Sequence, residues 1–212
     1  EYTPPSSLQQ VLRKYQRDGY RWLRTLDGYG MGGILADDMG LGKTLQVLSY
    51  LLAKKEAGQS LPSLIVCPAS LVLNWAEECK KFTPQLACLA VDGDAAHRAA
   101  LARQWAEVDL VVTSYDLLRR DGELYSQQAF YACILDEAQA IKNHTTQKYK
   151  AVCQVNSQVR FALTGTPVEN RLGELWSIFS FLMPGYLPPY KSFCARFEKP
   201  IVQEEDPNAV RR

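Results

Sequence analysis

Short, continuous apolar runs alternate along the chain with segments whose apolar residues recur at helical spacing. The apolar runs predict strands at about 33–36, 64–67, 86–91, 108–113, 131–135 and 160–163. The helical segments between them lie at about 45–56, 71–82, 95–107, 115–119, 124–130, 145–155 and 172–183. Strands that alternate with helices predict an α/β fold with a mostly parallel sheet and helices on both faces.

The two ends of the chain depart from this alternation. Before the first strand, we expect an amphipathic helix that starts at the capping residues Ser6 and Ser7 and ends near Asp27. After about Pro184 the alternation stops, although a helix near 191–197 is expected. We therefore assign residues 1–185 to one domain and interpret residues 186–212 as the start of a helical insertion or linker.

Composition narrows the class of protein. The 212 residues carry a net charge of +1, so any contact with nucleic acid must come from a local patch. The cysteines are scattered without a C-x-x-C pair, which favours reduced thiols and a reducing, cytoplasmic compartment. No apolar run reaches the ~18 residues of a membrane span, so no membrane contact is expected. Because the chain begins at Glu1, without methionine, we expect it to be a fragment.

The stretch 34–44 combines a strand, a turn with glycines and the start of a helix. Gly40 and Gly42 let the backbone curl so that its N–H groups point inward, and the helix N-terminus adds a partial positive charge. Lys43 would reach the β- and γ-phosphates of a nucleotide, and the Thr44 hydroxyl would bind Mg²⁺. A glycine-containing turn before an ordinary helix is the alternative.

Asp136 and Glu137 form a second candidate site at the end of the strand at 131–135. Ligands of open α/β sheets sit at the carboxyl ends of strands, so this pair is expected to join the phosphate loop. Asp136 would hold Mg²⁺, and Glu137 would polarise the attacking water as general base. An acidic pair at a helix start is common and is weak evidence for a site by itself. Its occurrence downstream of a phosphate loop favours the functional interpretation.

Taken in order, these motifs resemble the N-terminal RecA-like lobe of Swi/Snf-related superfamily-two ATPases, with a likeness to bacterial members. The resemblance runs from Leu12 to about Pro200 and rests on the segments 12–23, 37–44, 64–75, 112–121, 136–143 and 163–170. In this family aspartate is usual where Asp37 stands, although the strict phosphate-loop pattern has glycine there. Gln139 occupies a position where the family frequently has histidine.

The resemblance implies a RecA-like P-loop lobe that binds ATP and Mg²⁺. It implies catalytic roles for Lys43, Asp136 and Glu137, with Thr44 and Asp136 at the metal. ATP-binding residues are implied at Arg13, Gln16, Asp37, Met39, Gly40, Leu41, Gly42, Lys43 and Thr44. Gln16 suits an adenine edge because its amide donates and accepts at once, and a surface-helix glutamine is the alternative.

The resemblance also implies coupling and DNA-binding residues. Thr164, Gly165 and Thr166 would report the loss of the γ-phosphate, although a strand-ending turn explains them equally simply. Contacts with the backbone of double-stranded DNA, tolerant of its sequence, are implied for five residues, which are Pro68, Ser70, Thr113, Ser114 and Tyr115. Helix capping is the competing interpretation for Ser70, Thr113 and Ser114.

The implied function is a DNA-dependent ATPase that moves along double-stranded DNA, in the nucleoid of a bacterium or the nucleus of a eukaryote. In such motors a second RecA-like lobe of the same chain supplies arginine fingers, so this lobe alone, expected to be monomeric, should hydrolyse ATP barely. Two alternatives remain open. One is a superfamily-two DNA or RNA helicase, although DEAD-type RNA helicases carry Ser-Ala-Thr where this chain has Thr-Gly-Thr. The other is a non-catalytic DNA-binding scaffold, against which the intact loop and acidic pair argue.

Overall fold

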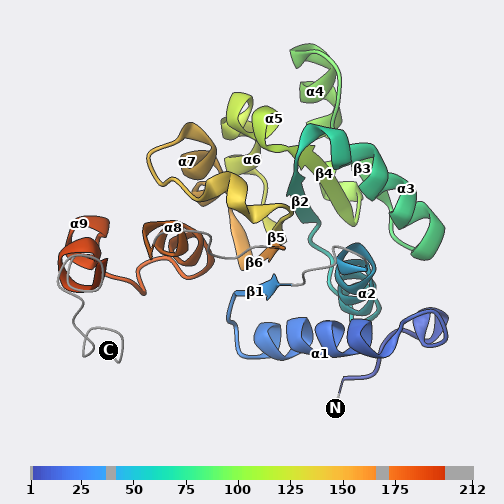
Figure 1. Cartoon of the computed structure of the whole chain (residues 1–212). Coiled ribbons are helices and arrows are strands. Elements are labelled where there is room, and N and C mark those ends of the chain that lie inside the picture. Colours follow the sequence, from blue (N-terminus) through green and yellow to red (C-terminus); the bar gives the residue numbers. More distant parts are fainter. Residues whose placement is uncertain (1, 37–41, 166–171, 199–212) are drawn as a thin grey trace.

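The computed structural model describes residues 2–36, 42–165 and 172–198. At its centre is one six-stranded sheet, in which every strand pairing is parallel (Figure 1). The strands are β1 (Gly33–Ala36), β2 (Ser63–Cys67), β3 (Cys88–Ala90), β4 (Leu110–Ser114), β5 (Phe130–Leu135) and β6 (Ser157–Thr164). Their order across the sheet is β1-β6-β5-β2-β4-β3. The predicted α/β class with a parallel sheet is confirmed.

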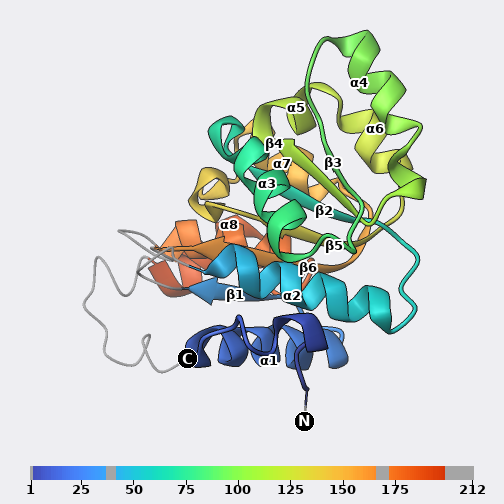
Figure 2. The ribbon, with the colours of Figure 1, turned by 90° about the vertical axis from the view of Figure 1, so that its right-hand side faces the viewer.

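Helices cover both faces of this sheet (Figures 1 and 2). They are α1 (Lys14–Gly28), α2 (Lys43–Glu56), α3 (Val72–Phe82), α4 (Ala95–Ala102), α5 (Tyr115–Arg120), α6 (Gly122–Gln127), α7 (Gln147–Cys153), α8 (Leu172–Leu182) and α9 (Tyr190–Phe193). Short 3-10 turns lie at Ser6–Leu8, Ala69–Leu71, Trp105–Glu107 and Ala138–Ile141, and Cys194–Glu198 is π-helical.

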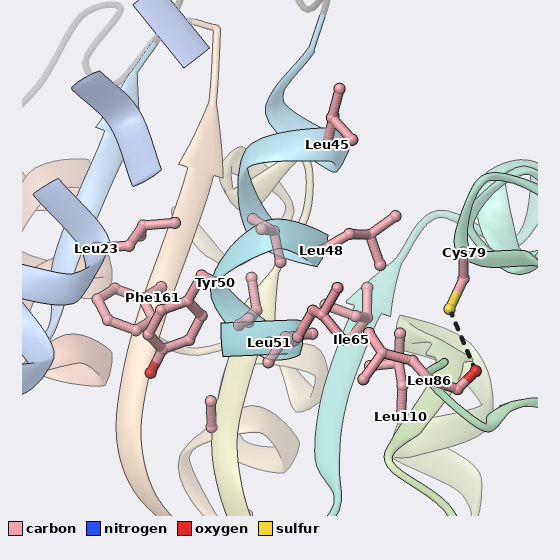
Figure 3. Packing of buried hydrophobic residues seen from close by; sticks show 14 of the residues in the cluster. Leu23, Leu45, Leu48, Tyr50, Leu51, Ile65, Cys79, Leu86, Leu110 and Phe161 are labelled. Carbon is pink, nitrogen blue, oxygen red and sulfur yellow. Dashed lines mark hydrogen bonds between the residues drawn. The ribbon is translucent and has the colours of Figure 1, made fainter. Parts of the chain in front are cut away.

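The central strands bury side chains on both faces, as their continuous apolar runs predict. In β2, Ile65 contributes to the core beneath α1, α2 and α3, whereas Leu64 contributes to the core beneath α5, α7 and α8. In the first of these cores α2 packs directly on the sheet, and its Tyr50 ring meets Phe161 of β6 edge-on at a centroid distance of 5.5 Å (Figure 3). This packing fixes the helix that follows the phosphate loop.

The N-terminal helix begins later than predicted. The segment from Ser6 forms a 3-10 turn, and α1 starts only at Lys14. The side chain of Gln16 explains this start, because its Oε1 accepts the backbone N–H of Arg13 at 2.8 Å and so satisfies a donor at the helix end. Leu8 is buried from outside the helix, whereas Trp22, which has the spacing of the apolar face of α1, is 48% exposed.

Tertiary packing divides the predicted helix at 95–107. The regular helix α4 ends at Ala102, and Trp105 belongs to a separate 3-10 turn. Trp105 is 1% exposed and its ring lies 4.6 Å from that of Tyr125 on α6. Burial of this large side chain outweighs continuation of the alanine-rich helix α4, in which Arg98 is the one buried residue. Similarly, the helix predicted at 124–130 ends at Gln127, and Phe130 begins β5.

The C-terminal helices lie beyond α8 at one end of the molecule (Figure 1). The helix predicted near 191–197 is present as α9 and the π-helical turn. Trp176 of α8 anchors the connection by donating its indole N–H to Pro188 O at 2.9 Å. The assignment of 186–212 to a linker stays a prediction, and residues 199–212 lie outside the described ranges. No helix within those ranges is long and apolar enough to span a membrane.

Candidate active site

The carboxyl ends of three neighbouring strands bring the predicted site together. Ala36 of β1 pairs with Thr164 of β6, and Leu135 of β5 pairs with Ala162 of β6. The phosphate loop follows β1, the acidic pair follows β5, and the coupling segment follows β6. Three segments that are far apart in the sequence therefore meet at one edge of the sheet, as expected for parallel strands.

Gly42 ends the phosphate loop and precedes α2. Its φ of 98° lies in the left-handed region, where a side chain would be strained. A Cβ at this position would also lie 2.2 Å from Gln16 Nε2, so a side chain there would displace the Gln16 amide. Lys43, the first residue of α2, is 8% exposed, and Thr44 is half-buried beside it. Of the other loop positions, Asp37, Met39, Gly40 and Leu41 lie outside the described residues.

Gln16 connects α1 to this loop. Its side chain is 6% exposed, its Oε1 caps the backbone of Arg13, and its Nε2 lies close to Gly42. It is therefore not a solvated surface glutamine. The Arg13 side chain is exposed next to it. The position of Gln16 beside the loop is compatible with a contact to bound nucleotide, although its oxygen is engaged here.

Asp136 is held by donors from three directions. Its Oδ2 accepts the indole N–H of Trp75 at 2.9 Å, and its Oδ1 accepts the backbone N–H of Glu137 at 2.9 Å. The hydroxyl of Tyr115 donates to the Asp136 carbonyl oxygen at 2.7 Å. Burial raises the pKa of the Asp136 carboxyl, while these two donors on its oxygens and the charge of Lys43 oppose the rise. The result is a fixed carboxylate, with Lys43 near enough to influence it.

Glu137 has an unusual backbone and an exposed side chain. At φ 49° and ψ 54°, it is the only non-glycine residue in the left-handed region within the described parts of the chain. Such a conformation costs on the order of 1–3 kcal/mol and clusters at functional sites. Its Oε2 accepts Gln139 Nε2 at 2.5 Å, and Gln139 Oε1 accepts the Thr164 hydroxyl at 3.1 Å. The exposed carboxylate is thereby linked to buried Thr164, beside which Gly165 is half-buried.

A model of the SNF2-related domain family matches residues 15–212. The chain belongs to the SNF2-related domain family. The family resemblance of the motifs is thereby confirmed.

Several curated proteins are similar to this SNF2-related domain. The TATA-binding protein-associated factor mot1 of Aspergillus fumigatus is 42% identical over 213 residues, which cover 95% of this chain and 11% of that protein. The human TATA-binding protein-associated factor 172 is 41% identical over 225 residues, covering 100% of this chain and 12% of the human protein. An uncharacterized ATP-dependent helicase of Mycoplasma genitalium is 43% identical over 189 residues, covering 89% of this chain and 18% of its own.

A solved structure agrees in fold. The SWI2/SNF2 ATPase core of Sulfolobus solfataricus in complex with dsDNA superposes with a TM-score of 0.85 at 41% identity, covering 93% of this chain and 41% of that chain. A second structure of the Sulfolobus solfataricus SWI2/SNF2 ATPase core domain gives a TM-score of 0.82 at 40% identity. The RecA-like fold is thus confirmed, and the chain spans less than half the length of each of these relatives and structures.

The donor set of this SNF2-related domain fits a nucleotide that carries Mg²⁺. Thr44 and Asp136 offer oxygen ligands, and Lys43 offers a cation for phosphate. Among the described residues, no group of three or more His, Cys, Asp or Glu side chains could hold a metal ion. A magnesium ion at this edge would therefore take its other ligands from phosphate and water, which is its usual mode of binding.

Three of the five expected DNA-binding side chains are buried in the SNF2-related domain. Thr113 is fully buried, and its hydroxyl is 2.6 Å from that of Tyr125. Ser114 accepts the N–H of Leu117 and caps α5, as the competing interpretation held. Tyr115 is 4% exposed, and its hydroxyl donates to the carbonyl oxygen of Asp136. Thr113 and Ser114 end β4 inside the fold, so direct DNA contacts through these three side chains are not supported.

The remaining expected residues have mixed positions. Ser70 is exposed and Pro68 half-buried in the segment after β2. Thr166 of the coupling motif lies outside the described residues. Sequence reasoning missed the contact between Trp75 and Asp136, which lie 61 residues apart. The only signal was the place of Trp75 in a family-like segment, and that carried no indication of its partner.

Proposed function

We propose that the chain is the ATP-binding first lobe of a DNA-dependent ATPase that hydrolyses ATP with Mg²⁺ and moves along double-stranded DNA. The observation that carries the proposal is the meeting of Lys43, Asp136 and Glu137 at the ends of neighbouring strands, on a SNF2-related domain. These residue types supply the three requirements of phosphoryl transfer to water, namely charge for the phosphates, a metal ligand and a base.

Each side chain has a distinct task in this proposal. The loop that ends at Gly42 cradles the phosphates with its N–H groups, and Lys43 binds the β- and γ-phosphates. Mg²⁺, held by Thr44 and Asp136, would neutralise charge on the phosphate oxygens. The exposed carboxylate of Glu137 orients a water molecule and accepts its proton as the water attacks the γ-phosphorus.

The hydrogen bonds between Glu137, Gln139 and Thr164 support a coupling role for the segment at 164–166. Loss of the γ-phosphate and of the attacking water removes the partners that would hold Glu137 in place. Gln139 passes a movement of Glu137 to Thr164, because its amide bonds to both side chains. Gly165 and Thr166 follow directly, so the strand end reports the state of the nucleotide.

The DNA contact is assigned to the exposed segment after β2. Ser70 offers an exposed hydroxyl in the turn Ala69–Leu71, which follows β2 at the same edge of the sheet as the nucleotide site. A dsDNA complex of a structurally similar core supports this choice of partner. Binding should weaken with salt by about 0.9 log units per log unit of salt for each phosphate neutralised, because counterions are released.

We assign the completion of the site to a second RecA-like lobe outside this chain. A typical arginine finger contributes on the order of 10³–10⁵ to the rate of nucleotide hydrolysis. The isolated lobe, residues 1–185 with the linker at 186–212, should therefore bind ATP weakly, with barely measurable turnover. We also expect the lobe to be monomeric. The full protein would act where its DNA lies, in the cytoplasmic nucleoid of a bacterium or the nucleus of a eukaryote.

The decisive experiment is ATP hydrolysis by the full-length protein, with and without duplex DNA, for the wild type and Glu137→Gln. We expect turnover to fall by roughly 10²–10⁴-fold, since the general base is lost, while ATP binding persists. Glu123→Gln is the matched control, because Glu123 is exposed and accepts a glutamine amide at 3.3 Å, away from the site. Full turnover by Glu137→Gln would refute both the base assignment and the proposed chemistry.

A strand-separating helicase is the second candidate, supported by the similarity to the uncharacterized ATP-dependent helicase of Mycoplasma genitalium. Displacement of a short labelled strand distinguishes the two, since a translocase on intact duplex should hydrolyse ATP without releasing it. A scaffold that retained only the fold would show no ATP hydrolysis in either assay.

A further inference from the structure

Trp75 reaches the proposed metal site from a helix that sequence motifs do not connect with catalysis. It lies in the first turn of α3, and its ring is 1% exposed in the core beneath α2 and α3. Its one polar atom, Nε1, donates to Asp136 Oδ2 at 2.9 Å. This is a direct side-chain hydrogen bond between a buried indole and a proposed metal ligand.

The two carboxylate oxygens of Asp136 have separate protein donors. Oδ1 accepts the N–H of Glu137, and Oδ2 accepts the indole of Trp75. With both oxygens engaged, the carboxylate cannot rotate freely about its Cβ–Cγ bond. Tyr115 holds the backbone of the same residue through the carbonyl oxygen. Each oxygen keeps a further lone pair, so the plane of the carboxylate is fixed while capacity for a ligand remains.

A second tryptophan shows that burial alone does not require such a bond. Trp105 is also 1% exposed and packs against Tyr125 and Phe130. Its Nε1 is buried without a hydrogen-bond partner. The fold therefore tolerates an unsatisfied indole N–H at one site and directs the other at a functional carboxylate. This contrast separates the packing contribution of a buried indole from its role as a donor.

We propose that Trp75 is a positioning residue, whose indole N–H orients the Asp136 carboxylate toward nucleotide-bound Mg²⁺. The inference rests on the proposed function, because it assigns Asp136 to the metal. Donors that orient a metal-binding group typically change metal affinity or activity by about 10–100-fold when they are removed. The indole acts through Asp136 and touches neither nucleotide nor metal.

The test uses the full-length protein and measures equilibrium binding, so that turnover is not needed. Affinity for a fluorescent ADP analogue is measured by anisotropy, once with Mg²⁺ and once with EDTA. For Trp75→Phe we expect Mg²⁺ to strengthen nucleotide binding on the order of tenfold less than in the wild type, with the EDTA affinity unchanged. Trp105→Phe, which removes an indole N–H without a partner, should leave both affinities unchanged.

A double-variant cycle tests whether the effect passes through Asp136. In an Asp136→Asn background, Trp75→Phe should cause little further loss, because the oriented carboxylate is already gone. If Trp75→Phe does not fold, as judged by circular dichroism, 3-benzothienylalanine introduced at position 75 keeps the bicyclic shape and removes only the N–H. The same loss of the Mg²⁺ effect is then expected.

The possible failures are distinguishable. If the wild type binds the nucleotide identically with Mg²⁺ and EDTA, the proposed function fails at this site. If the wild type shows the Mg²⁺ effect and folded Trp75 variants retain it in full, the positioning role is overturned while the proposed function stands. Additive losses in the cycle would likewise overturn the role, because Trp75 would then act independently of Asp136.

Discussion

Thr164 donates its hydroxyl to Gln139 Oε1 at 3.1 Å, which joins the end of β6 to the turn after β5. The same amide donates its Nε2 to Glu137 Oε2 at 2.5 Å. Only a group with a donor and an acceptor can serve both partners at once, and a glutamine amide has both. The residue that departs from the frequent family histidine thus makes the two contacts that a coupling role requires.

Gln139→Ala should separate nucleotide binding from turnover. ATP affinity is expected to persist, because Lys43 and Asp136 are untouched, whereas DNA-stimulated hydrolysis should fall on the order of tenfold or more. A hydrogen bond to a charged group is worth about 1.5–3 kcal/mol, which sets this magnitude. The measurement is kcat and KM for ATP in the full-length protein.

The matched control for that change is Gln127→Ala on α6. Gln127 also donates to a glutamate, at 3.3 Å, but in an exposed position away from the site. If Gln139→Ala hydrolyses ATP as fast as Gln127→Ala, the amide does not couple Glu137 to Thr164.

Asp136→Asn should stabilise the fold at neutral pH. Burial raises the pKa of Asp136 above its ordinary value of 3.8, so the folded state holds a proton more tightly than the unfolded state does. Between 3.8 and the raised pKa, the free energy of unfolding therefore falls as the pH rises, and above it the cost is present in full. Removing the charge relieves this cost at pH 7. Because the asparagine N–H₂ then faces one of the two donors, part of the gain is lost, and the free energy of unfolding should rise by at most about 1 kcal/mol.

Urea unfolding of the chain at several pH values measures this effect. The advantage of Asp136→Asn should shrink as the pH falls through the raised pKa. Asp116→Asn serves as the control, because that carboxylate is 59% exposed. A variant that is less stable than the wild type at pH 7 would show that the hydrogen bonds to the carboxylate outweigh its desolvation.

Arg98→Ala should be strongly destabilising. Arg98 and Asp121 join α4 to the junction of α5 and α6 through bonds of 2.6 and 3.1 Å, and their side chains are 9% and 14% exposed. Removal of the guanidinium leaves the Asp121 carboxylate without its ion-pair partner in a largely enclosed position, which is strongly destabilising. The midpoint of urea unfolding should fall accordingly.

Arg119→Ala provides the comparison for that loss. Arg119 pairs with Asp116 at 3.7 Å on the exposed surface of α5. Such pairs contribute about 0–1 kcal/mol, so a much smaller change is expected. Equal losses in the two variants would mean that the Arg98 pair is no more important than a surface pair.

The pattern of apolar residues predicted those elements whose structure depends mainly on neighbouring residues. The run at Leu64–Cys67 could only be a strand buried on both faces, and it is. The helix start was missed because Leu8 and Leu12 have helical spacing, yet Leu8 packs from a 3-10 turn and Leu12 from a bend. The true start depends on the backbone N–H of Arg13, which donates to the side chain of Gln16. The spacing of apolar residues indicates which side chains are buried, but it does not determine whether the backbone there is an α-helix or a 3-10 turn.

The position of a candidate site residue could be predicted where a single segment contains both the turn and the functional side chain, as at Gly42 and Lys43. It was not predictable where two distant segments meet. Thr113 ends the strand predicted at 108–113, where a DNA contact was expected, yet its side chain is buried and its hydroxyl is bonded to Tyr125. The partner of Trp75 is likewise set by how α3 lies on the sheet, which is a property of packing.

The pairing of β1 with β6 has a consequence for how the protein is made. Among the described strands, β1 pairs with β6 alone, so the edge that carries the phosphate loop joins the sheet only after β6 has been synthesised. Contacts between distant segments form slowly, because the intervening loop must be closed first. Nucleotide can therefore stabilise only a chain whose β6 has already emerged from the ribosome, and ATP should assist the final step of folding rather than its beginning.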